Sequence, residues 1–255
     1  MSDNNISNRE LELICEYYSN LERQGPGSSD VIQKALSFID PFPSDALIAD
    51  IGCGTGGQTL VLAENTQGKI AAIDLFPLFI NILNSNSEKR GFVDRIKGEV
   101  ASMDALTFKD GSLDLIWSEG AIYNIGFENG LNQWHRFIKK GGYIAVTEIS
   151  WFTNERPKEI DDFWNNNYPE IDTISNKISQ MQNAGYVPVA SFILPEECWT
   201  DNYYKPQVPV QKAFLDKYKG DTFAKELIEG QLQEAKLYEK YKDFYGYVFY
   251  IGKKI

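Results

Sequence analysis

Between residues 45 and 150, short apolar runs alternate with segments whose apolar residues recur at helical spacing. The runs are too short for helices and suit buried strands. Strands are predicted over 47–51, 69–74, 95–99, 113–117 and 143–149, with helices over 56–64, 77–89 and 127–138. This alternation is typical of a parallel sheet with helices on both faces.

Two helical patterns on either side of a turn precede this region. Apolar positions recur at helical spacing over residues 11–21 until Gly25-Pro26-Gly27 interrupts them. Ser28 can cap a second helix, which ends before Pro41. We therefore predict a helical lead-in over residues 1–44.

Beyond residue 150 the alternation stops. Residues 151–182 are polar and aromatic without an obvious strand, which predicts an inserted cap. The apolar run over 186–194 contains Pro188, which favours an edge position or the start of a strand because proline donates no ladder hydrogen bond. A late aromatic and β-branched run over 245–251 predicts a final strand, so residues 183–255 are expected to complete the sheet.

Composition restricts the class of protein. The chain has 255 residues, 43% of them hydrophobic, which is enough for one domain with a substantial core. A formal net charge of −11 repels polyanions, so no nucleic-acid partner is expected. No apolar stretch is long enough to span a membrane and no secretory signal is evident, so a cytoplasmic location without a membrane partner is expected. The three cysteines are far apart, which indicates reduced thiols, and no metal site is predicted.

A glycine-rich segment joins the first predicted strand to a helix. In Asp50-Ile51-Gly52-Cys53-Gly54-Thr55-Gly56-Gly57, the missing Cβ atoms allow a ligand to approach the backbone. Asp74 ends the adjacent predicted strand, where its carboxylate can accept hydrogen bonds from both hydroxyls of a ribose. Two other interpretations fit these residues. The glycines can merely form a tight turn with Asp74 capping a helix, and Gly52, Gly54 and Gly57 also satisfy the G-x-G-x-x-G pattern of dinucleotide binding.

Three features decide between these interpretations. Asp50 precedes the glycines, where dinucleotide enzymes usually have an apolar residue. Gly98-Glu99-Val100-Ala101-Ser102-Met103-Asp104 is followed at close spacing by Ser112-Leu113-Asp114, and Phe137-Ile138-Lys139-Lys140-Gly141-Gly142 follows later. In this order the motifs resemble the class I (Rossmann-like) S-adenosylmethionine-dependent methyltransferase family, small-molecule type, except that Lys140 replaces a usual proline.

The resemblance implies an α/β three-layer sandwich. Its seven-stranded Rossmann-like sheet is mostly parallel with an antiparallel last strand, and a helical lid and cap cover one edge. Within a single methyltransferase domain over 1–255, the lid is expected at 1–44, the cofactor-binding core at 45–150, the cap insertion at 151–182 and the C-terminal completion of the sheet at 183–255.

The same resemblance implies S-adenosylmethionine as cofactor, S-adenosylhomocysteine as product, and positions for their contacts. Gly52, Gly54 and Gly56 would approach the methionine and ribose, with Asp50 near the ammonium and Asp74 at the ribose hydroxyls. Around the adenine and the sulfonium, the matching positions are Leu75, Ser102, Met103, Asp104, Ser118 and Glu119. The segment from Glu22 to Ser28 also resembles the lid of small-molecule members related to quinone-biosynthesis and glycine/sarcosine methyltransferases, in which Tyr18, Gly27 and Ser28 would close over the methionine end. Several of these residues also have ordinary roles in packing and capping.

Methyl transfer requires mainly alignment of an activated donor with its acceptor. Glu119 and Glu148 lie near the carboxyl ends of predicted strands, so each is a candidate general base, amine anchor or cap. For the lone histidine, His135, a surface or structural role is expected.

An aromatic set is the candidate acceptor pocket, because rings attract cationic amines, although core packing explains the same residues: Tyr123, Trp151, Trp199, Tyr203 and Tyr204. We expect methyl transfer to a small-molecule acceptor by a monomer or homodimer. An NAD-dependent oxidoreductase and a non-catalytic S-adenosylmethionine-binding regulatory module are the alternatives.

Overall fold

The computed structural model is built around one mostly parallel sheet. It describes residues 7–255, so residues 1–6 of the predicted lid lie outside the described part. The main path of seven strands runs β3-β2-β1-β4-β5-β8-β7, and a short β6 pairs with β5. Only β8 is antiparallel to its neighbours, β5 and β7, which confirms the predicted sheet. The strands are β1 (Leu47–Ile51), β2 (Lys69–Asp74), β3 (Ile96–Val100), β4 (Leu113–Ser118), β5 (Ile138–Trp151), β6 (Asp172–Thr173), β7 (Tyr186–Ile193) and β8 (Tyr245–Lys254).

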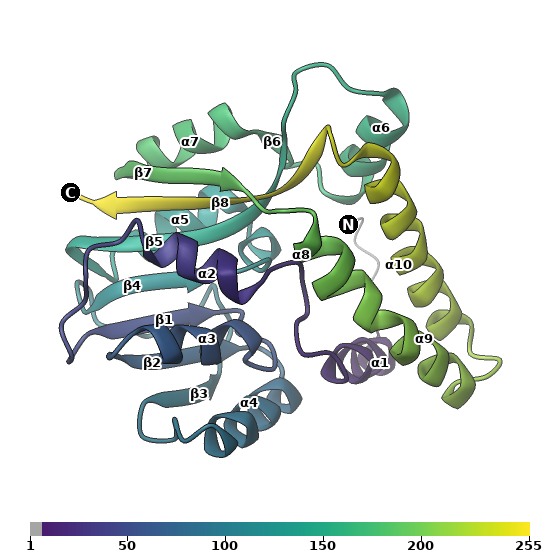
Figure 1. The fold of residues 1–255 in the computed structure, drawn as a ribbon, viewed down its shortest axis with the longest axis horizontal. Coiled ribbons are helices and arrows are strands. Elements are labelled where there is room, and N and C mark those ends of the chain that lie inside the picture. Colours follow the sequence, from purple (N-terminus) through teal and green to yellow (C-terminus); the bar gives the residue numbers. More distant parts are fainter. Residues whose placement is uncertain (1–6) are drawn as a thin grey trace.

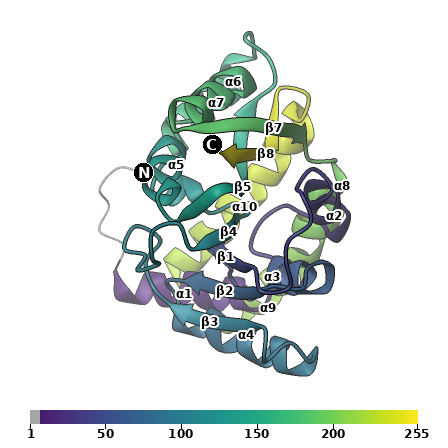
Figure 2. The same ribbon diagram turned by 90° about the vertical axis from the view of Figure 1, so that its left-hand side faces the viewer.

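Helices cover both faces of this sheet, as the end-on view in Figure 2 shows. Along β1, Ile48 packs with the helices of one face and Ala49 with those of the other, because successive side chains of a strand point to opposite sides. On one face lie α2 (Ser29–Leu36), α3 (Gly57–Asn65) and α4 (Pro77–Lys89), and on the other lie α5 (Phe127–His135) and α7 (Ile174–Asn183).

A third group of helices lies beyond the carboxyl ends of the parallel strands, on the right of Figure 1. Apolar side chains of α1 (Asn8–Ser19), α9 (Lys205–Lys217) and α10 (Thr222–Tyr241) form a separate small core that includes Leu13 and Phe214. The helical turns α8 (Glu197–Trp199) and η2 (Thr200–Tyr204) lead into α9. The remaining helices are η1 (Ile122–Asn124) and α6 (Lys158–Asn167).

Two details of the strands bear on the sequence predictions. Pro188 lies in β7, the outermost strand, and the pairing with β8 shifts register after it, so the predicted edge position is confirmed. The helix predicted over 127–138 instead ends at His135. A register shift between Leu113 and Leu115 allows Ile138 to pair with β4, so β5 begins earlier than predicted.

Candidate active site

The glycine loop between β1 and α3 lies directly against the segment that follows α1. Gly52, Gly54 and Gly56 have φ values of 77°, 55° and 93°, which side chains other than glycine rarely adopt. A Cβ on Gly54 would overlap the Gln24 side-chain oxygen, which accepts a hydrogen bond from the Thr55 amide at 3.0 Å. The loop backbone therefore needs glycine for its conformation and for the close approach of other groups.

Asp74 lies beside this loop at the carboxyl end of β2. One carboxylate oxygen accepts from the Gly54 amide at 2.9 Å and the other from the Phe76 amide at 3.0 Å. Burial raises the pKa of Asp74, although the side chain keeps some accessible surface. Because each carboxylate oxygen can accept more than one hydrogen bond, Asp74 retains capacity for two further donors.

Asp50 lies below the loop, between β1 and α3, and its side chain is 0% exposed. One carboxylate oxygen accepts from the Thr59 hydroxyl at 2.6 Å, while the other has no hydrogen-bond partner. Burial raises the pKa of Asp50 to about 7. The structure therefore gives Asp50 one free acceptor atom and no contact with bulk solvent.

This raised pKa predicts a pH-dependent stability. The folded protein binds the Asp50 proton more tightly than the unfolded chain, so this stabilisation is complete below pH 4 and is lost as pH rises through 7. The loss is at most about 4 kcal/mol. We expect Asp50→Asn to remove it, measured as unfolding free energies in urea at pH 5 and pH 8. Asp94→Asn, on the surface, is the control. An unfolding free energy that depends on pH equally in wild type and Asp50→Asn would contradict the prediction.

Of the predicted adenine contacts, Met103 lies beside the glycine loop. Leu75 is 55% exposed, which is unusual for a large apolar side chain in this core. Met103 lies close to Gly52, since its Cε is 3.6 Å from where a Gly52 Cβ would stand, and its carbonyl accepts from Trp134 Nε1 at 2.9 Å. Ser102 donates to Asp104 at 2.5 Å. Met103 therefore borders the loop, while Leu75, Ser102 and Asp104 keep accessible surface.

At the end of β4, Glu119 forms a nearly buried ion pair with Arg23. Arg23 contacts one carboxylate oxygen at 2.5 Å, and Trp117 Nε1 donates to the other at 2.8 Å. Burial raises the pKa of Glu119, and the charge of Arg23 opposes the shift. Ser118 is fully buried and donates to the Ile51 carbonyl at 2.7 Å, which ties β4 to β1.

The lid residues contribute in different ways. A Cβ on Gly27 would lie 2.8 Å from Glu119 Oε2, so Gly27 packs directly on the Arg23–Glu119 pair. Ser28 caps α2 through the Val31 amide. The Tyr18 carbonyl accepts from Gln24. Sequence reasoning did not select Arg23 or Gln24, although polar residues beside the Gly-Pro-Gly turn offered a signal.

Removing Arg23 is expected to weaken S-adenosylhomocysteine binding about tenfold. Arg23→Ala leaves Glu119 nearly buried without its counter-charge and loosens the segment that lies on the glycine loop. A tenfold loss of affinity corresponds to about 1.4 kcal/mol of binding free energy. Calorimetric titration measures the change. Arg90→Ala, which breaks an exposed pair with Glu64, is the matched control. Affinity within twofold of wild type for Arg23→Ala would contradict this role.

Glu148, the other predicted catalytic carboxylate, lies in a closed polar cluster. Its Oε1 contacts Lys177 Nζ at 3.0 Å and accepts from the Tyr168 hydroxyl at 2.5 Å. The Glu148 and Lys177 side chains are each 1% exposed, and burial raises the pKa of Glu148. The pairing of Lys177 was not predicted, although a lysine among the apolar positions of α7 was a visible signal.

The predicted aromatic residues lie in three places. Trp199, Tyr203 and Tyr204 lie together, with ring centroids 5.3 Å apart for the two tyrosines and 6.0 Å for Trp199 and Tyr204. Tyr123 contacts Tyr168 at 6.0 Å. Trp151 instead packs under Arg156, whose guanidinium carbon lies 4.0 Å from the centroid of the Trp151 ring. His135 packs edge-on against Tyr186 at 5.0 Å, which fits the structural role expected for it.

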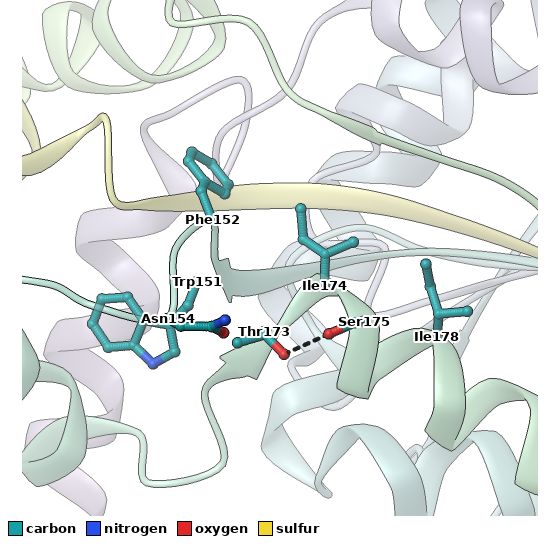
Figure 3. Close-up of a pocket in the computed structure, with 7 residues that line it drawn as sticks. All are labelled: Trp151, Phe152, Asn154, Thr173, Ile174, Ser175 and Ile178. Carbon is teal, nitrogen blue, oxygen red and sulfur yellow. Dashed lines mark hydrogen bonds between the residues drawn. The ribbon is translucent and has the colours of Figure 1, made fainter.

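Trp151 lines a surface hollow of about 410 Å³ at the end of β5 (Figure 3). Phe152 and the first residues of α7, including Ile178, complete its wall, and the Thr173 and Ser175 hydroxyls bond each other at 3.0 Å. No residue of the glycine loop lines it. The hollow is therefore distinct from the site around Asp74.

Within residues 7–255, no three His, Cys, Asp or Glu residues are grouped so that they could hold a metal ion. None of the helices in that same part of the chain is both long and apolar enough to cross a membrane.

Comparison with known proteins supports a common core. Residues 48–142 match the family model described as a methyltransferase domain. Phosphoethanolamine N-methyltransferase of Triticum aestivum is 24% identical over 79% of this chain and 39% of its own length. Dimethylglycine N-methyltransferase of Parasynechococcus marenigrum is 27% identical over 48% of this chain and 44% of its own length. The chain thus spans less than half the length of these curated relatives.

A solved structure extends the likeness over the fold. A methyltransferase from Geobacter sulfurreducens in complex with S-adenosyl-L-homocysteine superimposes with a TM-score of 0.81, at 17% identity, over 96% of this chain and 98% of the other. At that identity, the likeness establishes the fold alone.

Proposed function

Because the chain belongs to the class I S-adenosylmethionine-dependent methyltransferases, we propose that it transfers the donor's methyl group to a small-molecule acceptor. The observation that most supports this is the Asp74 carboxylate held against the glycine loop, with spare acceptor capacity on both oxygens. Both relatives reported above methylate small molecules according to their names, which supports an acceptor of that size.

The residues around the loop fit the cofactor. Asp74 would bind the ribose hydroxyls, and the exposed Leu75 side chain together with Met103 would hold the adenine. Arg23 keeps a buried Nε without a hydrogen-bond partner, which leaves it a donor for an anionic group. The glycine loop leaves room for close approach to its backbone.

When bound, S-adenosylmethionine supplies an activated methyl group on a positive sulfur. The chain's own residues need to align the acceptor in line with that methyl and exclude water. Asp74, Leu75 and Met103 would hold this donor, which would supply its methyl group to the acceptor and leave as S-adenosylhomocysteine. We propose that Glu119 lies beside the transferred methyl group. Glu148 acts indirectly, because Lys177 and Tyr168 hold its carboxylate.

In this proposal, the described part of the predicted lid, residues 7–44, covers the site, with 45–150 as the cofactor-binding core, 151–182 as the cap and 183–255 as the rest of the sheet. Helices α9 and α10 share the covering role, because α1 packs on them.

The test is turnover. The protein is incubated with S-adenosylmethionine and separate panels of amines, phenols and quinols, and S-adenosylhomocysteine is measured by mass spectrometry. Acceptor-dependent product is the expected result. Tight donor binding without product over all panels would instead indicate a non-catalytic binding module.

A further inference from the structure

The helices beyond the carboxyl ends of the parallel strands share a core of their own (Figure 1). Leu13 and Tyr17 of α1 pack with Phe214 of α9 and Ile228 of α10, apart from the two cores that flank the sheet. Side chains that are packed closely hold their backbones in a fixed arrangement, because a dense core resists sliding of its parts. These helices are therefore expected to move as one body.

Polar contacts fasten the same helices to one another. The Tyr17 hydroxyl of α1 donates to Gln207 of α9 at 2.6 Å, and both residues are fully buried. The neighbouring Glu16 contacts Lys217 Nζ at 2.6 Å and accepts from the Tyr218 hydroxyl at 2.7 Å. We call α1, α9 and the first part of α10 the cover unit, which comprises residues 8–19, 205–217 and 222–229.

Helix α10 leaves the cover unit at Gly230. Ala224 and Ile228, before it, belong to the small core, whereas Leu237 and Tyr238, after it, pack in a core beside the sheet. Glycine weakens the interior of a helix because its backbone loses the most freedom on folding. Outside the helix's own backbone, no atom of residues 7–255 lies within 4 Å of where a Gly230 Cβ would stand, so packing does not require glycine here. Gly230 is therefore a point at which α10 bends readily, at the boundary between two cores.

A second connection to the cover unit runs through η2, which leads into α9. Its five residues form a π-helical turn, a rare element that is frequent at functional sites. Pro206 and Pro209 follow at the start of α9, and neither can donate the backbone hydrogen bond that would hold this stretch in α-helical form. The backbone from η2 into α9 is therefore weaker than a regular helix.

The third connection is the segment 20–28, which joins α1 to α2 and contains Gly25-Pro26-Gly27. It lies on the glycine loop, since the Glu22 carbonyl oxygen is 2.6 Å from where a Gly57 Cβ would stand. Asn202 Nδ2 of η2 donates to the Gly27 carbonyl at 3.0 Å, which fastens the second connection to the third. A displacement of η2 or of α1 therefore acts directly on the segment that covers the loop.

We propose that the cover unit swings as one body on these three connections and thereby gates the donor site. Each connection carries a feature that weakens the backbone, whereas the unit itself is packed and fastened inside. Because α1 holds one end of segment 20–28, the swing lifts this segment from the glycine loop and opens a route for the donor and its product. Asn202 is a positioning residue that holds the gate closed. The inference rests on the proposed function, because it concerns access to the same site.

The first variant removes the hydrogen bond between η2 and the segment. Asn202→Ala should raise both the association and the dissociation rate constant of S-adenosylhomocysteine about fivefold, the factor that one neutral hydrogen bond supplies. Asn202 holds the segment in the free and the bound protein alike, so the dissociation constant should stay within about twofold of wild type. Surface plasmon resonance on the immobilised full chain measures both rate constants. Asp201→Asn, which breaks only an exposed pair with Lys205, is the matched control.

The second variant stiffens the connection in α10. The space beside Gly230 accommodates the methyl group of Gly230→Ala, which strengthens the helix, so both rate constants should fall by at least about twofold. A purely structural role for Gly230 would raise the thermal midpoint of the variant and leave both rate constants unchanged. Asn202→Ala and Gly230→Ala thus shift the same two rate constants in opposite directions, which a general loss of folding cannot produce.

Hydrogen–deuterium exchange of residues 20–28, recorded without added ligand, follows the motion independently of donor binding. Relative to wild type, this segment should exchange faster in Asn202→Ala and more slowly in Gly230→Ala. Unchanged exchange, or unchanged rate constants, in both variants would overturn the gate. If wild type fails to bind S-adenosylhomocysteine, the proposed function is contradicted instead, and the exchange measurement still decides whether the cover unit moves.

Discussion

Asp74→Ala is expected to weaken S-adenosylhomocysteine binding at least 100-fold. In the proposed site, the Asp74 carboxylate accepts hydrogen bonds from both ribose hydroxyls, and a hydrogen bond to a charged group contributes about 1.5 to 3 kcal/mol. Losing two such bonds exceeds the roughly 2.7 kcal/mol that corresponds to 100-fold. Calorimetric titration of wild type and variant measures the change.

Two controls separate this effect from damage to the loop. Asp74 also holds the Gly54 and Phe76 amides, so the thermal midpoint of Asp74→Ala should be recorded beside its affinity. Asp74→Asn keeps the shape of the side chain and should bind with intermediate affinity, whereas the exposed Asp94→Ala should bind like wild type. Affinity of Asp74→Ala within threefold of wild type would refute the ribose assignment.

Lys177→Met is expected to destabilise the fold by about 3 to 5 kcal/mol. The substitution leaves Glu148 buried without its counter-charge, and breaking a buried pair on one side has a cost of that size. Unfolding free energies from urea titration at pH 7 measure the loss.

The double variant Glu148→Gln with Lys177→Met should recover most of this stability, because no uncompensated charge remains. The difference between the double variant and the sum of the single variants gives the coupling between the two side chains. If Lys177→Met alone loses less than about 1 kcal/mol of unfolding free energy, the Glu148–Lys177 pair does not stabilise the fold as proposed.

Features encoded by neighbouring residues were predictable from the sequence. The turn from β1 to α3 needs Gly52, Gly54 and Gly56 because the backbone there has positive φ, and this requirement is visible in the residues themselves. The edge position of β7 follows in the same way from Pro188, which cannot donate to a second neighbour. Strands β1 and β2 match their predicted bounds because apolar runs flanked by polar turns define both ends.

Features that depend on distant pairs were not predictable. Arg23 and Glu119 are 96 residues apart and meet only when α1 docks over the end of β4. Trp151 packs under Arg156 and lines the hollow beside α7, two contacts that also join separate parts of the chain. Nothing in the local sequence distinguishes these arrangements from their alternatives.

Glu234 shows where a signal existed but was not used. Ile228, Tyr238 and Tyr241 form the buried stripe of α10, and Glu234 lies on it at helical spacing. An acidic residue on such a stripe needs a partner, which a single helix cannot identify. The hydrogen-bond partner of Glu234, the Tyr204 hydroxyl, lies on η2, so the contact forms only in the folded chain.

The most direct test of the central claim is a calorimetric titration of the wild-type protein with S-adenosylmethionine, S-adenosylhomocysteine and NADH. A class I methyltransferase site around the glycine loop and Asp74 predicts micromolar affinity for the first two ligands and no binding of NADH. Binding of NADH alone would contradict the claim and assign the glycine loop to redox chemistry.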